Sequence, residues 1–120
     1  MRLLIVFWLA FCAPAAFADG EQWTALSGDE ISDTLTGRIV QYASATQDFR
    51  VSGRTLYNAG RDSWGYWAVR GSQYCSLWPP QDLWACYGLQ QQGDRLRFIG
   101  AAGDVADGVL VGVVDQQATE

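Results

Sequence analysis

From Ile39 to Val114 the chain is a succession of short segments in which apolar and polar residues alternate, separated by turns rich in glycine. Repeated short strands with turn signals about every 8–12 residues are typical of an antiparallel meander. Closing such a sheet removes its exposed edges, so a strongly curved sheet or a small barrel is expected. We therefore predict a mainly β fold with roughly seven or eight strands. The predicted strands are residues 39–42, 48–52, 54–58, 64–70, 73–78, 83–89, 95–99 and 109–114.

One short helix is predicted before the strands, over residues 28–36. Ser27 and Glu30 have the spacing of a capping box, in which each residue binds the backbone N–H of the other. Ile31 and Leu35 form one apolar stripe, and Gly37 is a suitable residue to end the helix. A chain of 120 residues has the size of one domain. We assign that domain to residues 19–120, with a core over residues 24–114.

Residues 1–18 have the pattern of an export signal. Arg2 provides a basic start, residues 3–12 are apolar, and the small residues of Ala16-Phe17-Ala18 indicate cleavage between Ala18 and Asp19. The apolar run is shorter than the about 20 residues that a helix needs to cross a bilayer, so no membrane anchor is expected after cleavage. A buried N-terminal helix is the alternative. The predicted location is the periplasm of a Gram-negative bacterium, or the medium.

Removal of this signal would leave two cysteines, Cys75 and Cys86. Two cysteines in an exported chain favour one disulfide between them. If they face each other on antiparallel strands, the side chains of Tyr74 and Trp78 lie on the face opposite Cys75. The same register predicts two further cross-strand pairs around a Pro79-Pro80 turn, Leu77 with Trp84 and Trp78 with Leu83.

Four aromatic side chains near this hairpin are the candidate binding residues: Trp67, Trp78, Trp84 and Tyr87. In a domain of this size, large rings are also needed to bury enough surface for a core. Rings at a barrel mouth or in an exposed patch would instead bind an apolar ligand or a partner. The sequence does not decide which rings face inward, so both interpretations remain open.

The composition excludes several kinds of chemistry. The chain has no His, and all eight of its basic residues are Arg. A Ser-His-Asp triad, a histidine metal site and Schiff-base chemistry are therefore ruled out. A formal net charge of −5 also argues against a nucleic-acid partner. We predict a non-enzymatic protein with no cofactor and no metal.

Two groups of carboxylates are the remaining candidates for catalysis or metal binding. Asp29, Glu30 and Asp33 have carboxylates suited to acid–base work, but the first two are accounted for by the start of the helix. Asp104 and Asp107 lie between glycines, yet they lack the full set of oxygen ligands that a calcium loop requires. A carboxylate-based enzyme is therefore only a remote alternative.

The segment 98–103, Phe-Ile-Gly-Ala-Ala-Gly, resembles the glycine-rich turn of nucleotide-binding reductases, in particular dihydrodipicolinate reductase. It lies near the end of the chain, where a βαβ unit has no room, and Ala106 occupies the place of a third glycine. We interpret the segment as a turn between strands and expect no reductase activity.

Several motifs resemble those of a broad group of small exported proteins of alphaproteobacteria. They are the helix start at residues 26–31, Gly65-Tyr66-Trp67, Cys75-Ser76-Leu77-Trp78 and Cys86-Tyr87. The resemblance covers residues 24–100 and implies export, one disulfide and a β-rich fold. It implies no activity and transfers no functional residue.

The expected function is that of an exported, monomeric β-domain that binds a small apolar ligand or a partner protein through its aromatic residues. The main alternative is an inhibitor or accessory factor of a cell-envelope enzyme, which would insert the loop 78–84 into a cleft. A deep cavity lined by aromatic rings would favour the first hypothesis. A filled core with a protruding loop would favour the second.

Overall fold

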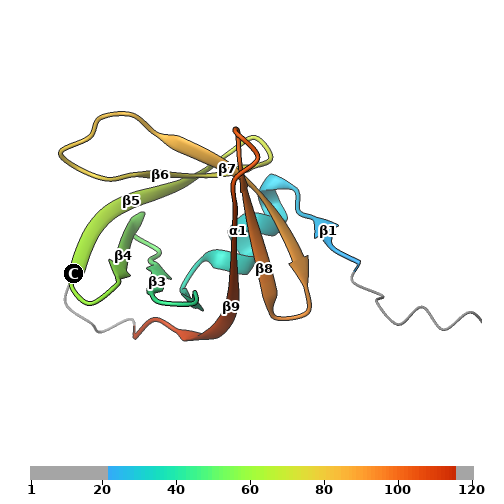
Figure 1. Cartoon of the computed structure of the whole chain (residues 1–120), viewed down its shortest axis with the longest axis horizontal. Helices are drawn as coiled ribbons and strands as arrows, with labels where there is room; N and C mark the ends of the chain where they lie inside the picture. Colours follow the sequence, from blue (N-terminus) through green and yellow to red (C-terminus); the bar gives the residue numbers. More distant parts are fainter. Residues whose placement is uncertain (1–21, 116–120) are drawn as a thin grey trace, which may run out of the picture.

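A computed structural model describes residues 22–115 of the protein. The predicted export signal, residues 1–18, and its cleavage site between Ala18 and Asp19 lie outside the described residues. Within the described range the structure is mainly β, with one short helix, and the strands curl around that helix (Figure 1).

Eight antiparallel strands form a closed barrel in the order of the sequence. Each strand pairs with the next one along the chain, and β9 pairs with β2, where Val40 lies opposite Leu110. The predicted meander and its closure into a barrel are confirmed. The barrel strands are β2 (Arg38–Gln41), β3 (Thr46–Phe49), β4 (Arg54–Asn58), β5 (Asp62–Arg70), β6 (Gln73–Leu77), β7 (Ala85–Gln92), β8 (Arg95–Gly100) and β9 (Val105–Val113).

A ninth strand, β1 (Thr24–Ala25), lies outside the barrel and was not predicted. It pairs with the last part of β7, with Thr24 opposite Gln91 and Ala25 opposite Gln90. At this point β7 has already diverged from β6, whose register with β7 covers only Tyr74 to Ser76. Strand β1 therefore occupies an edge of β7 that the barrel leaves unpaired.

The helix α1 (Gly28–Leu35) begins with the capping box expected from the sequence. Ser27 N donates to Glu30 Oε1 over 3.0 Å, and Glu30 N donates to Ser27 Oγ over 3.3 Å. Ile31 and Leu35 are fully buried in the barrel core. Gly28 approaches the β5–β6 turn so closely that a Cβ atom there would collide with the carbonyl oxygen of Gly71. The helix thus closes the end of the barrel that holds the β5–β6 turn.

The barrel interior is apolar next to this helix. Phe49, Trp67, Leu89 and Leu96 pack there with the helix side chains in one cluster. Alternate residues of each strand point inward, as the pleat of a β-strand requires. Toward the opposite end of the barrel, the residues that point inward are aromatic and polar, and they line a cavity.

The predicted hairpin is confirmed at its disulfide. Cys75 lies opposite Cys86, their Cα atoms are 4.0 Å apart, and the S–S bond is 2.06 Å long. The two pairs predicted beyond it are wrong, because β6 ends at Leu77 and β7 begins only at Ala85. Residues 78–84 form a loop instead, with a turn in which Gln81 N donates to Trp78 O over 3.0 Å.

Two other predicted strands differ from those observed by more than two residues at one end. The segment predicted at 48–52 is β3, Thr46–Phe49, because Arg50 begins a tight turn in which Gly53 N donates to Arg50 O over 3.0 Å. Gly53 has a φ of 89°, a left-handed conformation that favours glycine. The segment predicted at 109–114 begins earlier, at Val105, which pairs with Ile99.

Candidate functional site

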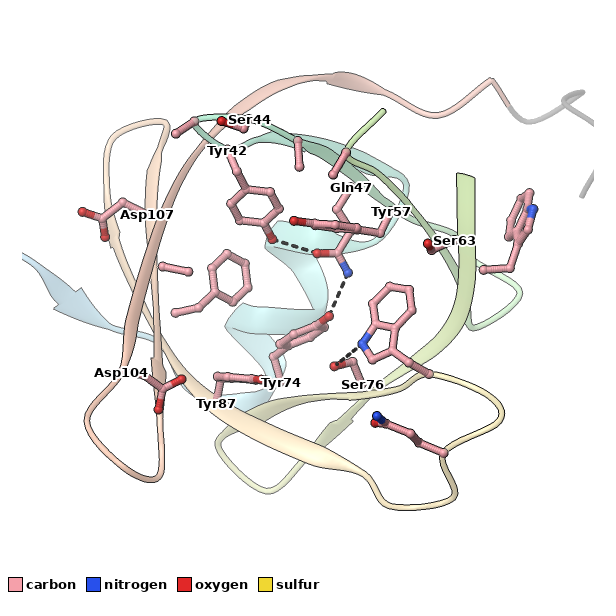
Figure 2. A pocket seen from close by; sticks show the side chains of 18 of the residues that line it. Tyr42, Ser44, Gln47, Tyr57, Ser63, Tyr74, Ser76, Tyr87, Asp104 and Asp107 are labelled. Atoms are coloured by element: carbon pink, nitrogen blue, oxygen red, sulfur yellow. Dashed lines mark hydrogen bonds between the residues drawn. The ribbon is translucent and has the colours of Figure 1, made fainter. Parts of the chain in front are cut away.

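A cavity of about 980 Å³ opens at the end of the barrel opposite helix α1. The loops β2–β3, β4–β5, β6–β7 and β8–β9 surround its mouth, since all four contribute residues to its lining. Figure 2 looks into the cavity, with the helix visible behind its floor. An eight-stranded barrel has an interior wide enough for one small ligand when side chains do not fill it.

Six aromatic rings of the cavity lining form a continuous series of neighbours. Consecutive ring centroids are 5.4 to 6.2 Å apart, within the range of favourable aromatic contacts. Four of the rings come from β4, β6, β7 and β8, and the other two directly follow the ends of β2 and β6. In order, they belong to Trp78, Tyr57, Tyr42, Phe98, Tyr74 and Tyr87.

Gln47 connects two of these tyrosines through hydrogen bonds at the base of the cavity (Figure 2). Its Oε1 accepts from the Tyr42 hydroxyl over 2.8 Å. Its Nε2 donates to the Tyr74 hydroxyl over 2.9 Å and to Thr55 Oγ1 over 3.0 Å. Gln47 and Tyr74 are each only 4% exposed, so these bonds hold the rings in fixed positions.

Burial keeps the phenols of Tyr42 and Tyr74 neutral. Desolvation raises the pKa of Tyr74 to about 12, although its hydrogen bonds with Gln47 and Ser76 act in the opposite direction. Desolvation also raises the pKa of Tyr42, and the neighbouring phenols Tyr74, Tyr57 and Tyr87 add to this shift. The cavity therefore disfavours negative charge at its base.

Glycines in the barrel wall make room for two of the rings. A Cβ atom at Gly65 would lie 2.6 Å from Trp78 Cε3, and one at Gly108 would lie 3.1 Å from Tyr42 Cδ1. The Trp78 indole is further fixed by a hydrogen bond from its Nε1 to Ser76 Oγ over 3.1 Å. Gly65 thus leaves the space that the Trp78 ring occupies just beyond the end of β6.

Two carboxylates lie at the cavity mouth. Asp107 is ion-paired with Arg97, whose Nε and Nη2 donate to its Oδ1 and Oδ2 over 2.8 and 3.1 Å. Hydrogen bonding to Arg97 lowers the pKa of Asp107. Asp104 is the last residue of the β8–β9 connection, directly before β9, and its carboxylate lies against Gly100.

The structure separates the four predicted binding residues. Trp78 and Tyr87 line the cavity. Trp67 belongs to the apolar core, where it is 8% exposed and its Nε1 donates to Arg50 O over 2.9 Å. Trp84 lies in the loop between β6 and β7, half-buried, with the Arg70 guanidinium 4.4 Å from its ring centroid. Trp67 and Trp84 are therefore not part of the cavity lining.

Other tryptophans are covered by arginines in the same way. Arg50 and Arg54 lie 4.7 and 4.3 Å from the Trp64 ring, and Arg97 lies 4.2 Å from the Trp23 ring. Such cation–π contacts stabilise an aromatic ring outside the core. They account for Trp84 and Trp23 without a ligand, whereas Trp64 also belongs to the cavity lining.

Six side chains that shape the cavity were not predicted as site residues: Tyr42, Gln47, Tyr57, Tyr74, Ser76 and Phe98. Strand parity held part of the signal, because it already placed Tyr74 and Trp78 on the same face. Tyr42 and Tyr57 also lie at strand ends, next to loops that would meet at one mouth of a closed barrel. These observations point to one cavity only when the pairing of β9 with β2, which closes the barrel, is known.

The remaining candidate groups lie elsewhere. Asp29, Glu30 and Asp33 are on helix α1, at the closed end, and Glu30 is engaged in the capping box. The glycine-rich segment 98–103 ends β8 and forms a turn in which Gly103 N donates to Gly100 O over 3.0 Å, as predicted. Among residues 22–115, no three His, Cys, Asp or Glu side chains gather as metal ligands would. The helix described in this range is too short to cross a membrane.

No protein-family model, curated protein or solved structure significantly matches this chain.

Proposed function

We propose that this protein is an exported, non-enzymatic binding protein that holds a small, largely apolar ligand in the open end of its barrel. The observation that carries the proposal is the cavity of about 980 Å³ with its continuous series of aromatic rings. Ligand pockets are typically of about 300–1,000 Å³ and mainly apolar, with a few polar groups that orient the ligand. The polar side chains of this lining include Gln47 and Ser76.

A matched pair of variants tests whether the cavity binds ligands. N-phenylnaphthylamine, a neutral apolar probe whose fluorescence rises in apolar surroundings, is titrated into the protein. Ala106 lines the cavity at its mouth, so Ala106→Trp should obstruct it and weaken probe binding at least about tenfold. Ala102→Trp, in the exposed β8–β9 turn, should leave probe binding unchanged. Absence of probe binding, or equal binding by both variants, would refute the proposal.

A second candidate function is the capture of a partner, such as a cell-envelope enzyme, by the β6–β7 loop. This loop extends away from the barrel (Figure 1), and Leu83 within it is 80% exposed. A photo-crosslinking side chain at Leu83, compared with one at Val51, distinguishes this function. Val51 is similarly exposed, at 73%, but lies in a turn at the closed end. One specific adduct from position 83 alone would support capture, whereas identical adducts from both positions would exclude it.

A further inference from the structure

Among residues 22–115, the cavity lining contains carboxylates but none of the seven Arg side chains. Asp104 and Asp107 belong to the lining. Arg61, in the β4–β5 loop near the mouth, is exposed and outside the lining. Asp62, at the start of β5, and Asp82, in the β6–β7 loop, add negative charge near the mouth. Around the open end these carboxylates outnumber the Arg side chains, so the local charge favours a cationic ligand over an anionic one.

Asp104 is the carboxylate that faces the interior of the barrel. Leu96 and Phe98 of β8 point inward, and Gly100 follows them at the same parity. A Cβ atom at Gly100 would collide with the Asp104 carboxylate, so this carboxylate occupies the inward direction at the rim. Among residues 22–115, no Arg forms an ion pair with it. Asp107, in contrast, is neutralised by Arg97, and Figure 2 shows its side chain directed away from the cavity centre.

The wall below Asp104 is aromatic. Tyr87 lies directly opposite Gly100 in the β7–β8 register, next to the site of the Asp104 carboxylate. The Tyr74 ring is 6.0 Å from Tyr87, and the Phe98 ring is 5.4 Å from Tyr74. Aromatic rings attract cations through their quadrupole, most strongly where water is excluded. A cation at the rim would be held by Asp104 and by these rings together.

We propose that the ligand of this cavity is an organic cation, specifically an alkyl- or aryl-substituted quaternary ammonium group. This inference rests on the proposed ligand-binding function and narrows it to a chemical class. The apolar part of the ligand fills the barrel, and its ammonium group lies between Asp104 and the rings of Tyr87, Tyr74 and Phe98. A quaternary nitrogen has no N–H to donate, so it needs no hydrogen-bond acceptor beyond the carboxylate charge.

Three compounds of similar shape and size but different charge test the effect of ligand charge on binding. Phenyltrimethylammonium, tert-butylbenzene and benzenesulfonate each carry a compact tetrahedral group on a phenyl ring, with positive, zero and negative charge. Each is titrated against bound N-phenylnaphthylamine, and the concentration that displaces half of it is measured. The cation should displace the fluorescent probe at a concentration at least about tenfold lower than the neutral compound. The anion should be the weakest of the three.

Two sets of variants assign the preference to the proposed groups. Asp104→Asn should remove most of the advantage of the cation and leave displacement by tert-butylbenzene unchanged. Asp94→Asn removes the same charge at the closed end, in the β7–β8 turn, and should change neither value. Tyr87→Leu should weaken displacement by the cation more than displacement by tert-butylbenzene, and Tyr87→Phe should retain both because the ring remains. Circular dichroism spectra and melting temperatures identify any variant that fails to fold.

The outcomes distinguish this inference from the proposed function. If the fluorescent probe binds but the cation displaces it no better than the neutral compound, the cavity is a binding site and the cation inference is wrong. If Asp104→Asn and Asp94→Asn reduce the preference equally, the preference comes from overall charge and the assignment to Asp104 is wrong. If neither the fluorescent probe nor the cation binds, as calorimetry would show for the cation, both proposals fail.

Discussion

The buried tyrosines predict that the folded state loses stability in alkaline solution. Burial raises the pKa of Tyr74 from 10.0 to about 12 in the folded state, whereas in the unfolded chain the phenol returns to its ordinary value. The unfolded state therefore releases this proton first as the pH rises. The contribution of Tyr74 is fully present below about pH 10 and is lost as the pH rises to about 12.

The size of the effect follows from the shift. A difference of about two pH units corresponds to about 3 kcal/mol of unfolding free energy, lost at up to about 1.4 kcal/mol per pH unit. The pKa of Tyr42 is raised in the same direction by the same cause, so the total loss should exceed that of Tyr74 alone. The chain has no Lys, so tyrosines are the side chains that titrate in this interval.

Urea unfolding between pH 8 and pH 12, followed by far-ultraviolet circular dichroism, measures this loss. Tyrosinate absorbance on the same samples reports ionisation. Tyr74→Phe should flatten the alkaline decline, although it also removes a hydrogen bond to Gln47 and lowers stability at neutral pH. Tyr66→Phe is the matched control, since Tyr66 is 45% exposed, and should leave the decline unchanged. Ionisation of all the phenols near pH 10 with no loss of stability would show that burial does not have the assigned effect.

Three substitutions test the packing. Cys75→Ser should lower the unfolding free energy by about 3 kcal/mol in oxidising buffer, from the entropy of the short loop that the disulfide closes, and unchanged urea melts would count against this. Gly28→Ala should destabilise by about 1–3 kcal/mol despite the higher helix propensity of alanine, because the added methyl group collides with Gly71 O; a gain in melting temperature would contradict this account. Gly65→Ala should displace Trp78 and weaken binding of N-phenylnaphthylamine, and a crystal structure with the indole unmoved would disprove that role.

The fold could be read from the sequence wherever the information was local. The capping box at Ser27, the succession of strands and the Cys75–Cys86 register all depend on residues close together along the chain. The length of the β6–β7 hairpin was not predicted, and the contact of Trp78, just beyond the end of β6, with Gly65 of β5 joins residues from different strands. That contact becomes visible only when β5 and β6 are placed side by side.

The cavity was harder to predict than the fold. Its ring series joins residues from strands that are distant in sequence, such as Tyr42 on one side and Phe98 on the other. Their contact requires the closure of β9 onto β2, which no local pattern specifies. Trp67 and Trp84 were predicted as binding residues because they lie near the cysteines in sequence. In the structure Trp67 packs in the core, and Trp84 contacts the Arg70 guanidinium from the β6–β7 loop.

The pairing of β6 with β7 is the shortest around the barrel, since its register runs only from Tyr74 opposite Tyr87 to Ser76 opposite Ala85. It is also the place of the disulfide, at the middle pair. A short ladder opens more readily than its neighbours in local fluctuations, so this junction is where the closed cylinder would first become an open sheet. The disulfide prevents this opening, which would expose the edges of β6 and β7 to pairing with other chains. In a reducing environment the same protein would therefore first lose its resistance to aggregation, before it lost its fold.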